Sequence, residues 1–404
     1  MQLDALILGG GIAGLWTLRL LVAAGYDAAL VETRALGDGQ TIASQGILHA
    51  GTKYALSGHA AEASRAAGDA AAVWRECLAG GGRGARGTDL PDLSGAAVLS
   101  RHTHMFTTPG AGSRLTGLAA SKALAVGPRK LGRGELPAAF AGAPAGVDVY
   151  ELDEPVLESA SLIGTLAGPV RERLVLAPTV TLGHDDAGVS ARLVTSEGER
   201  VLRARAAVLA AGAGNGALLA GLGLAPEIRM QRRPLHMVMA RGGLPGLFAH
   251  CVSLSDKPRA TITTARDRAG RSVWWIGGQI AESGVERSTE GQVAAARREL
   301  GEIVPWVDLR GAEWATWRVD RAEGFDPHGR RPDTPVVRRA GNVIACWPTK
   351  LVLAPLGAGM VLAELASLGV APSGPAGRGD GGAIAPARPS VAAAPWDRED
   401  VAWS

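Results

Sequence analysis

Residues 3–32, LDALILGGGIAGLWTLRLLVAAGYDAALVE, contain every part of a dinucleotide-binding unit in the expected order. An apolar run is followed by the spacing GxGxxG, a long apolar helical pattern, a second apolar run and an acid. Gly9 permits a tight turn from strand to helix, Gly11 lets a pyrophosphate approach the backbone, and Gly14 lets the helix pack closely on the strand. The stretch therefore predicts a βαβ unit that holds a diphosphate at the positive end of its helix.

Glu32 distinguishes among the dinucleotides. It follows the glycines by about 20 residues, where an acidic side chain accepts hydrogen bonds from the adenosine ribose. A 2′-phosphate at that place would be repelled by the carboxylate, which argues against NADP. The alternative interpretation is a corner of a parallel sheet that binds no ligand.

Composition limits the classes of protein to be considered. The chain has 404 residues, enough for two domains, and its formal net charge of +3 gives no reason to expect a nucleic-acid partner. The three cysteines, Cys77, Cys251 and Cys346, are far apart and form no CxxC pair. This usage fits a reducing compartment and argues against a redox-active disulfide or a zinc site, so we expect no metal.

No targeting or transmembrane segment is predicted. The N-terminal apolar run has no basic stretch before it and is interrupted by Asp4, unlike a signal peptide. Residues 206–225 reach the length of a membrane span, but GAGNG at their centre predicts a strand, a turn and a helix instead. We expect a cytoplasmic protein, with peripheral attachment at an inner membrane as the alternative.

The remainder of the chain predicts an α/β protein with a second, antiparallel sheet. Short β-rich runs between residues 231 and 280, separated by proline and glycine, are typical of antiparallel strands. Residues 371–390 are rich in proline, glycine and alanine and are predicted to be disordered, whereas two tryptophans in the last nine residues are candidates to dock on the body. The other predicted elements are a helix and then a strand within 151–183, a hairpin around 196–200, a helix at 289–303, and a strand, turn and helix within 341–369.

Residues 40–51, QTIASQGILHAG, resemble the second motif of the D-amino-acid-oxidase-like (DAO) FAD-dependent oxidoreductases. Within that superfamily the motif is most similar to L-2-hydroxyglutarate dehydrogenases, and KYAL after it is similar to FAD-linked glycerol-3-phosphate dehydrogenases. The resemblance implies an α/β fold: a Rossmann-like FAD-binding domain with an inserted antiparallel substrate-binding sheet. It divides the chain into a discontinuous FAD-binding domain (1–95, 151–226 and 330–370), a substrate-binding domain (96–150 and 227–329) and a low-complexity C-terminal tail (371–404).

The resemblance also implies which residues bind FAD. The N-terminal turn would hold the pyrophosphate, the strand LVLAPTV would lie against the adenine, and WPTKLVLAPLGAG would follow the pyrimidine edge of the flavin. The implied cofactor-binding residues are Gly9, Gly11, Ile12, Ala13, Gly14, Glu32, Thr33, Thr41, Ser44, Gln45, Gly46, Val180, Ala211, Gly212, Lys350 and Leu351. GAGNGA at 212–217 could instead mark an NAD site, but no strand and acid follow at the required distance, so we expect FAD alone.

The resemblance does not identify the substrate, because the sequence departs from the family pattern at several positions. Gln45 stands where hydroxyglutarate dehydrogenases have glycine after an Asn-Ser pair, and Thr52 and Lys53 also differ from their pattern. These positions are expected to face the substrate.

His49 is the candidate general base. Oxidation of an alcohol by a flavin moves a hydride to N5 of the ring and requires a nearby base for the hydroxyl proton, and histidine titrates in the right range. The alternative for His49 is a structural histidine bonded to backbone. His236, in the apolar strand RPLHMVM, is the rival base, but a core histidine is the favoured interpretation there.

Two cations complete the predicted site. Lys350 would stabilise the negative charge that a reduced flavin gains at its N1 and C2 carbonyl edge, the alternative being an exposed loop lysine. Arg321, together with Arg318 and Lys53, could bind a carboxylate or phosphate of the substrate through its guanidinium fork, although arginines in this chain are more often surface charges. Four tryptophans are expected in the core: Trp274, Trp275, Trp314 and Trp317.

The predicted function is FAD-dependent oxidation of a CH–OH group in a small anionic substrate, of the 2-hydroxy-acid or glycerol-phosphate type. The alternative within the same architecture is an amino-acid or secondary-amine oxidase or dehydrogenase. A third possibility is a flavoprotein that acts in assembly without turnover. Oxygen or a quinone would accept the electrons.

Overall fold

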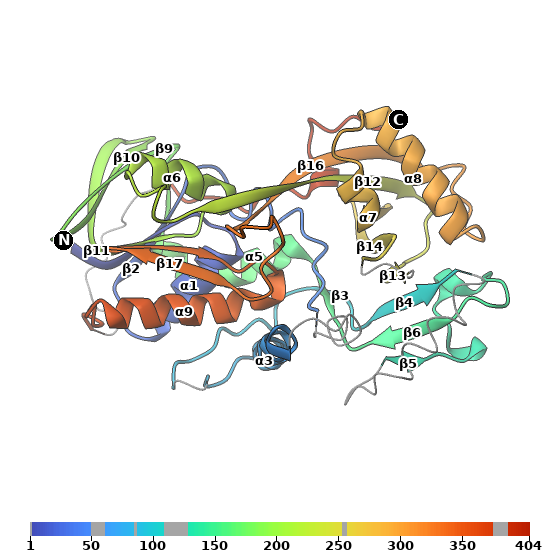
Figure 1. The fold of residues 1–404 in the computed structure, drawn as a ribbon, viewed down its shortest axis with the longest axis horizontal. Coiled ribbons are helices and arrows are strands. Elements are labelled where there is room, and N and C mark those ends of the chain that lie inside the picture. The colour runs from blue at the N-terminus through green and yellow to red at the C-terminus, as the bar shows by residue number, and fades with distance from the viewer. Residues whose placement is uncertain (1, 50–60, 85–86, 109–127, 253–256, 375–386) are drawn as a thin grey trace.

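The computed structural model describes residues 2–49, 61–84, 87–108, 128–252, 257–374 and 387–404. They form two eight-stranded sheets, one on the left and one on the right of Figure 1. The long strands β12 (Met230–Gly242) and β16 (Glu313–Gly324) start or end beside the first sheet and belong to the second. The architecture confirms the predicted α/β fold with an additional, largely antiparallel sheet.

The first sheet has the order β17-β18-β11-β1-β2-β8, and β10 and β9 extend from β11. The pairs β18–β11, β11–β1, β1–β2 and β2–β8 are parallel. β1 occupies the middle because its almost continuous apolar run can be buried on both faces. The strands are β1 (Gln2–Leu8), β2 (Ala28–Glu32), β8 (Leu174–Leu176), β9 (Thr179–Asp185), β10 (Gly188–Thr195), β11 (Gly198–Leu209), β17 (Val336–Ala340) and β18 (Val343–Trp347).

Helices cover one face of this sheet and enclose its main core. Helices α1 (Ile12–Ala23), α5 (Ser159–Ala167) and α9 (Ala354–Ser367) pack there, and α3 (Ala61–Leu78) lies against α9 (Figure 1). Trp16 and Trp74 join α1 to α3, with ring centroids 4.4 Å apart. The opposite face packs against α6 (Asn215–Gly221) and the β9–β10 hairpin.

The second sheet has the order β16-β12-β15-β14-β13-β4-β6-β5 and is antiparallel apart from the β13–β4 pair. Its core contains Phe106, Phe140, Trp274 and Trp314 under helix α8 (Thr289–Ile303). The Ser288 hydroxyl accepts from the Gly291 amide and caps that helix. The remaining elements are β4 (Thr103–Thr107), β5 (Arg129–Lys130), β6 (Val149–Leu152), β13 (Ala249–Val252), β14 (Ala260–Arg266), β15 (Ser272–Gly277), α7 (Gln279–Ser283), and the separate pair β3 (Val98–Ser100) and β7 (Val156–Leu157).

The predicted elements agree with the structure wherever the sequence pattern was strong. The hairpin around 196–200 is β10–β11, and the helix expected at 289–303 is α8. The apolar stretch 206–225 is the end of β11, a 3-10 turn and α6, as expected. Within the described residues no helix combines the length and apolar character needed to cross a membrane.

The C-terminal region departs from the prediction of disorder. Residues 375–386 lie outside the described part, but residues 387–390 form backbone hydrogen bonds with the first sheet and its connecting loop. The Leu176 amide donates to Ala387 O (3.1 Å) and the Leu36 amide to Ser390 O (2.8 Å). The low-complexity composition of residues 371–390 had predicted disorder for this segment. Further along, Trp396 packs against Trp275 and Trp403 against Arg241, so the two C-terminal tryptophans dock on the body as expected.

Candidate functional site

A cavity of about 600 Å³ lies at the carboxyl ends of β1, β2, β11 and β18. This is the edge at which open α/β sheets bind their ligands, and the volume falls in the range of cofactor sites. The peptide segments that follow each of these four strands form its wall. Of the residues expected to bind FAD, the wall contains Gly9, Gly11, Ile12, Ala13, Glu32, Thr33, Thr41, Ser44, Val180, Ala211, Gly212, Lys350 and Leu351.

The glycines of the first turn leave no room for side chains. Gly9 has φ +107°, and a Cβ there would lie 2.5 Å from Ala211 Cα, where β11 passes close to β1. A Cβ on Gly14 would lie 1.9 Å from Gly9 O, so Gly14 serves the packing of α1 on β1 and not the cavity wall. Glycine at these positions therefore allows the turn to pack closely against the segment after β11 and allows α1 to pack closely on the turn.

The N-terminus of α1 fits a diphosphate. Gly11 provides no side-chain cap for the helix, while Thr41 Oγ1 accepts from the Ile12 amide at 3.2 Å. Helix N-termini with backbone N–H groups facing a cavity bind phosphates. Glu32 Oε2 accepts from the Gly10 amide at 2.7 Å and its other oxygen from the Thr33 amide at 2.8 Å. The acid thus orders the turn and also lines the cavity where an adenosine ribose was expected.

Gln45 and Gly46 lie outside the cavity wall, contrary to the expectation from the motif. Gln45 Nε2 donates to Thr261 O (2.8 Å) and Trp275 O (3.0 Å), and so joins the motif to the second sheet. Gly46 has φ +69°, and a Cβ there would lie 2.0 Å from Leu157 O. Both residues therefore have structural roles that the motif does not indicate: the Gln45 side chain holds the motif to the second sheet, and Gly46 allows close contact with the Leu157 backbone.

The turn after β18 is strained where it meets the cavity. Thr349 has φ +63°, a conformation that β-branched residues rarely adopt. Its hydroxyl donates to Pro348 O at 2.6 Å, and the Lys350 amide donates to the same oxygen at 2.7 Å. Strain of this kind is commonly retained at binding sites, and here it sets the direction of the Lys350 backbone.

Lys350 is a buried lysine of the cavity wall. Its ammonium lies 3.9 Å from Asp333 Oδ1, and only 6% of its side chain is exposed. Burial, followed by repulsion from Arg331, lowers the pKa of Lys350 to about 7. The alternative of an exposed loop lysine is therefore wrong.

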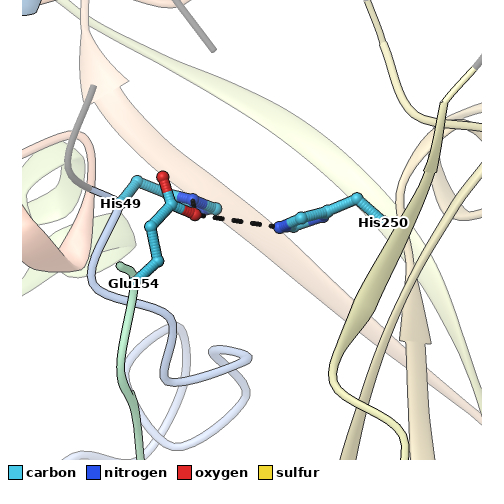
Figure 2. Close-up of side chains that lie close together, drawn as sticks. All are labelled: His49, Glu154 and His250. Atoms are coloured by element: carbon cyan, nitrogen blue, oxygen red, sulfur yellow. Dashed lines mark hydrogen bonds and ion pairs between the residues drawn. The ribbon is translucent and has the colours of Figure 1, made fainter. Parts of the chain in front are cut away.

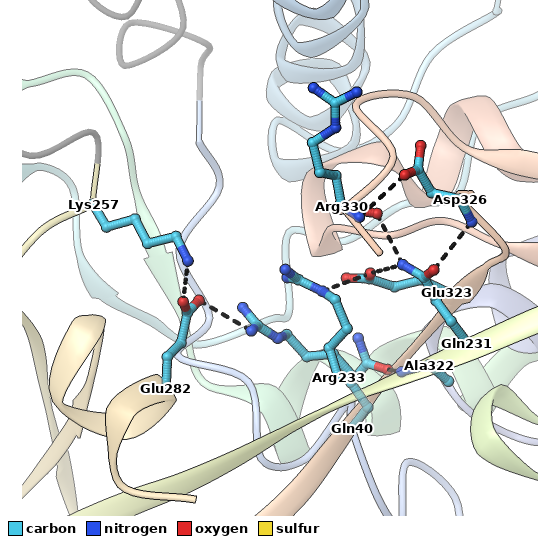
Figure 3. A network of polar contacts seen from close by, with 10 residues as sticks. Gln40, Gln231, Arg233, Lys257, Glu282, Ala322, Glu323, Asp326 and Arg330 are labelled. Carbon is cyan, nitrogen blue, oxygen red and sulfur yellow. Dashed lines mark hydrogen bonds and ion pairs between the residues drawn. The ribbon is translucent and has the colours of Figure 1, made fainter. Parts of the chain in front are cut away.

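Arg321 pairs with Glu282 in a polar network built mainly on β12, β16 and α7, and Figure 3 labels Glu282 and most of the other members. Arg321 Nη2 donates to Glu282 Oε1 at 3.0 Å, and Lys257 pairs with the same carboxylate. Arg233, directly across from Arg321 in the β12–β16 pair, donates to the fully buried Glu323 at 2.9 Å. Burial, followed by repulsion from Arg233, lowers the pKa of the Arg321 guanidinium.

Arg318 does not join Arg321. The two residues are three apart in β16, and because side chains alternate along a strand they point to opposite faces. Arg318 instead donates to the backbone oxygens of Val285 (2.5 Å) and Arg287 (2.6 Å). The structure therefore does not bring Arg318 and Arg321 together: Arg318 lines the cavity and Arg321 does not. Lys53 lies outside the described residues.

His49 is paired with a buried acid (Figure 2). Its Nδ1 lies 3.0 Å from Glu154 Oε2, and the Glu154 side chain is fully buried. His250 Nε2 is 4.0 Å from the same oxygen, and His250 Nδ1 is 2.8 Å from the Thr261 hydroxyl. The Thr103 hydroxyl also points at this oxygen, at 3.4 Å. His49 is not in the wall of the cavity.

Sequence reasoning missed Glu154 and His250. They come from the β6–β7 turn and from β13, so only the folded chain brings them to His49. Their donor atoms and that of His49 all lie within 4.8 Å, close enough to hold a metal ion. The His49–Glu154 hydrogen bond accounts for the contact without one, and the absence of a metal stays a prediction.

The remaining candidates are mostly structural. His236 is fully buried, with Nδ1 3.0 Å from Gly284 O, in agreement with the core interpretation. Trp274, Trp275 and Trp314 are buried as expected. Trp317 is the exception, because it lines the cavity.

Comparison with known proteins identifies the family. A family model for FAD-dependent oxidoreductases (DAO) matches residues 4–365. The chain belongs to this DAO family. Its cofactor is FAD and it is an oxidoreductase, in agreement with the glycine motif and with the cavity that the glycines line.

One relative in Pseudomonas aeruginosa, named as a probable FAD-dependent oxidoreductase (PA4991), is 42% identical over 92% of this DAO chain and 93% of its own. Its crystal structure superposes with a TM-score of 0.80 and covers 98% of each chain at 38% identity. Glycine oxidase from Geobacillus kaustophilus has a TM-score of 0.64 at 19% identity, over 91% of this chain and 95% of that one. L-α-glycerophosphate oxidase from Mycoplasma pneumoniae, solved with FAD bound, has the same TM-score at 13% identity and the same coverage. The last two likenesses concern the fold alone.

Proposed function

We propose that the protein oxidises the CH–OH group of a small anionic substrate, of the 2-hydroxy-acid or glycerol-phosphate type. The observation that carries the proposal is the hydrogen bond between His49 and the buried Glu154 (3.0 Å). When bound, the flavin of FAD accepts a hydride at N5 from the substrate carbon. The residues of the chain must then remove the hydroxyl proton and orient the anion.

His49 and Glu154 suit proton removal. With the carboxylate accepting from Nδ1–H, the imidazole is held in the tautomer whose Nε2 can accept a proton. The negative charge of Glu154 stabilises the imidazolium that forms when His49 takes the hydroxyl proton. A positioned base of this kind contributes about 10²–10⁴-fold to a rate.

The cations of the network suit an anionic substrate. Arg321 Nε is buried and has no hydrogen-bond acceptor among the described residues, so one edge of its guanidinium fork remains to be satisfied. Arg233, directly across from Arg321 in the β12–β16 pair, adds a second guanidinium beside it. A carboxylate or phosphate is the partner that this geometry binds best.

Amine oxidation is the competing proposal. The fold is shared with glycine oxidase, and a neutral amine can release a hydride without help from a protein base. The same Arg321 could bind the carboxylate of an amino acid. The two proposals therefore share the anion site at Arg321, but only alcohol oxidation requires His49 as a base.

The test is anaerobic reduction of the purified holoenzyme by a panel of substrates. Hydroxy acids and glycerol phosphates should bleach the flavin absorbance, and amino acids and secondary amines should not. The opposite pattern would establish the amine alternative. If none of the compounds reduced the flavin, both proposals would be rejected in favour of a protein without turnover. Re-oxidation with oxygen or a soluble quinone then identifies the electron acceptor.

A further inference from the structure

Residues 387–404, here called the C-terminal strap, cross from the first sheet to the second. We propose that the strap is part of the FAD site and retains the cofactor, with Arg398 as the strap residue that faces it. The inference depends on FAD being the cofactor and not on the identity of the substrate.

The strap begins on the FAD side of the molecule. The Leu36 amide donates to Ser390 O at 2.8 Å and the Ala392 amide to Leu36 O at 2.9 Å, which forms a parallel bridge between Leu36 and Val391. Leu36 is buried, and its side chain covers Gly10 in the first glycine turn, 2.5 Å from where a Cβ would stand. The strap is thus fixed to the loop that closes over the diphosphate-binding turn.

The strap ends on the second sheet. The Ser404 amide and carbonyl exchange hydrogen bonds of 2.9 Å with Trp314 in β16. The Arg241 guanidinium stacks on the Trp403 ring, 3.9 Å from its centroid, and Trp396 packs edge-on against Trp275. These contacts attach the two ends of one segment to different sheets.

Arg398 lies between the two attachments, in the wall of the cofactor cavity. Its Nη1 is 3.1 Å from Asp38 Oδ1, and its guanidinium is 4.9 Å from the Trp317 ring centroid. Asp38 comes from the loop after β2, Trp317 from β16, and both line the cavity. Arg398 therefore joins the two walls between which the cofactor must lie.

The charges around Arg398 favour an anion. Arg34 pairs with the other oxygen of Asp38 at 3.1 Å, so two guanidinium groups share one carboxylate. Arg398 also pairs through Nε with Asp400, at 3.3 Å, and Asp400 stands outside the cavity wall. The wall itself contains Arg34, Asp38 and Arg398, which carry two positive charges against one negative. The diphosphate of FAD is the anionic part of the cofactor and would be attracted there. The family model ends at residue 365, so the strap lies outside the part of the chain that the family defines.

The experiment measures FAD retention by the holoenzyme. Release of FAD is followed by ultrafiltration over a dilution series for the wild type, for Arg398→Met and for a chain truncated after residue 386. Arg310→Met is the matched control, because Arg310 is 91% exposed and pairs only with the neighbouring Asp308 among described residues. Arg398→Met should raise the Kd for FAD about tenfold, and truncation should raise it further.

The thermal unfolding of the FAD-free proteins separates retention from folding. Arg398→Met loses the contacts with Asp38, Asp400 and Trp317 and should unfold only a few degrees below the wild type, about the effect of a partly exposed ion pair, while releasing FAD far more readily. Arg310→Met should change neither quantity. If truncation prevents folding, Arg398→Met decides the question, because it keeps the strap in place. A Kd within twofold of the wild type for Arg398→Met would overturn the proposal.

Discussion

Lys350 shows how the fold changes the chemistry of a single residue. Its usual pKa is 10.5, and burial followed by repulsion from Arg331 lowers the pKa to about 7. Between these two values the unfolded chain binds one proton more than the folded chain, so stability should rise with pH across that window.

Lys350→Met removes this dependence. At about pH 7 the FAD-free variant should be more stable than the FAD-free wild type by a few kcal/mol, since it no longer buries an ammonium group. The difference should shrink as the pH approaches about 10, where the wild-type lysine is largely neutral in the folded state. Urea unfolding of both proteins at the two pH values measures it. A difference that does not vary with pH would show that Lys350 is not the titrating group.

Arg321 tests the anion site. Arg321→Lys keeps the positive charge but loses the guanidinium fork, so the KM of the best substrate should rise about tenfold. Arg310→Lys, at a 91% exposed arginine away from the cavity, is the matched control, and its KM should stay within about twofold of wild type. Steady-state kinetics of the three proteins decide the matter. Equal KM values for both variants would remove Arg321 from substrate binding.

At the scale of elements, the sequence predicted most where residue spacing follows directly from a steric or burial requirement of the element. The glycine spacing of residues 9–14 predicts β1, the turn and α1, because backbone contact excludes side chains there. The antiparallel strands and α8 were also predictable from alternation and helical periodicity. In the strap, docking of the two tryptophans was expected, whereas the order of residues 387–390 was not, because their contacts are with distant residues and their composition is typical of disorder.

Gly14 provides the test at this scale. In Gly14→Ala the new Cβ would lie 1.9 Å from Gly9 O, so α1 must move away from β1. We expect a loss of about 1–3 kcal/mol in the free energy of unfolding and loss of the flavin absorbance. Gly301→Ala in α8, where nothing lies within 4 Å of the added methyl, should instead be neutral or stabilise by about 0.5–1 kcal/mol. Urea unfolding and flavin absorbance measure both effects, and full FAD content in Gly14→Ala would refute the role of close packing.

At the scale of the whole molecule, the site depends on residues that no local pattern connects. His49 was found from its motif, but Glu154 and His250 come from the β6–β7 turn and from β13. The pairing of Arg321 in β16 with Glu282 in α7, and the attachment of the strap, likewise depend on contacts between residues far apart in the sequence. The sequence therefore predicted the cofactor and most of its cavity, whereas the partners of His49 and Arg321 were visible only in the structure.

The central proposal is that His49, oriented by Glu154, removes the hydroxyl proton of an alcohol substrate. The most direct measurement is the rate of flavin bleaching after rapid anaerobic mixing with the best substrate, across pH, for the wild type, His49→Ala and the surface control His328→Ala. With FAD retained, His49→Ala should lose about 10²–10⁴-fold in this rate, and the wild-type rate should fall as the pH is lowered, because only the neutral imidazole can accept the hydroxyl proton. His328→Ala should match the wild type. Near-equal rates for His49→Ala and the wild type, with a pH profile that follows the substrate itself, would contradict the proposal and favour amine oxidation.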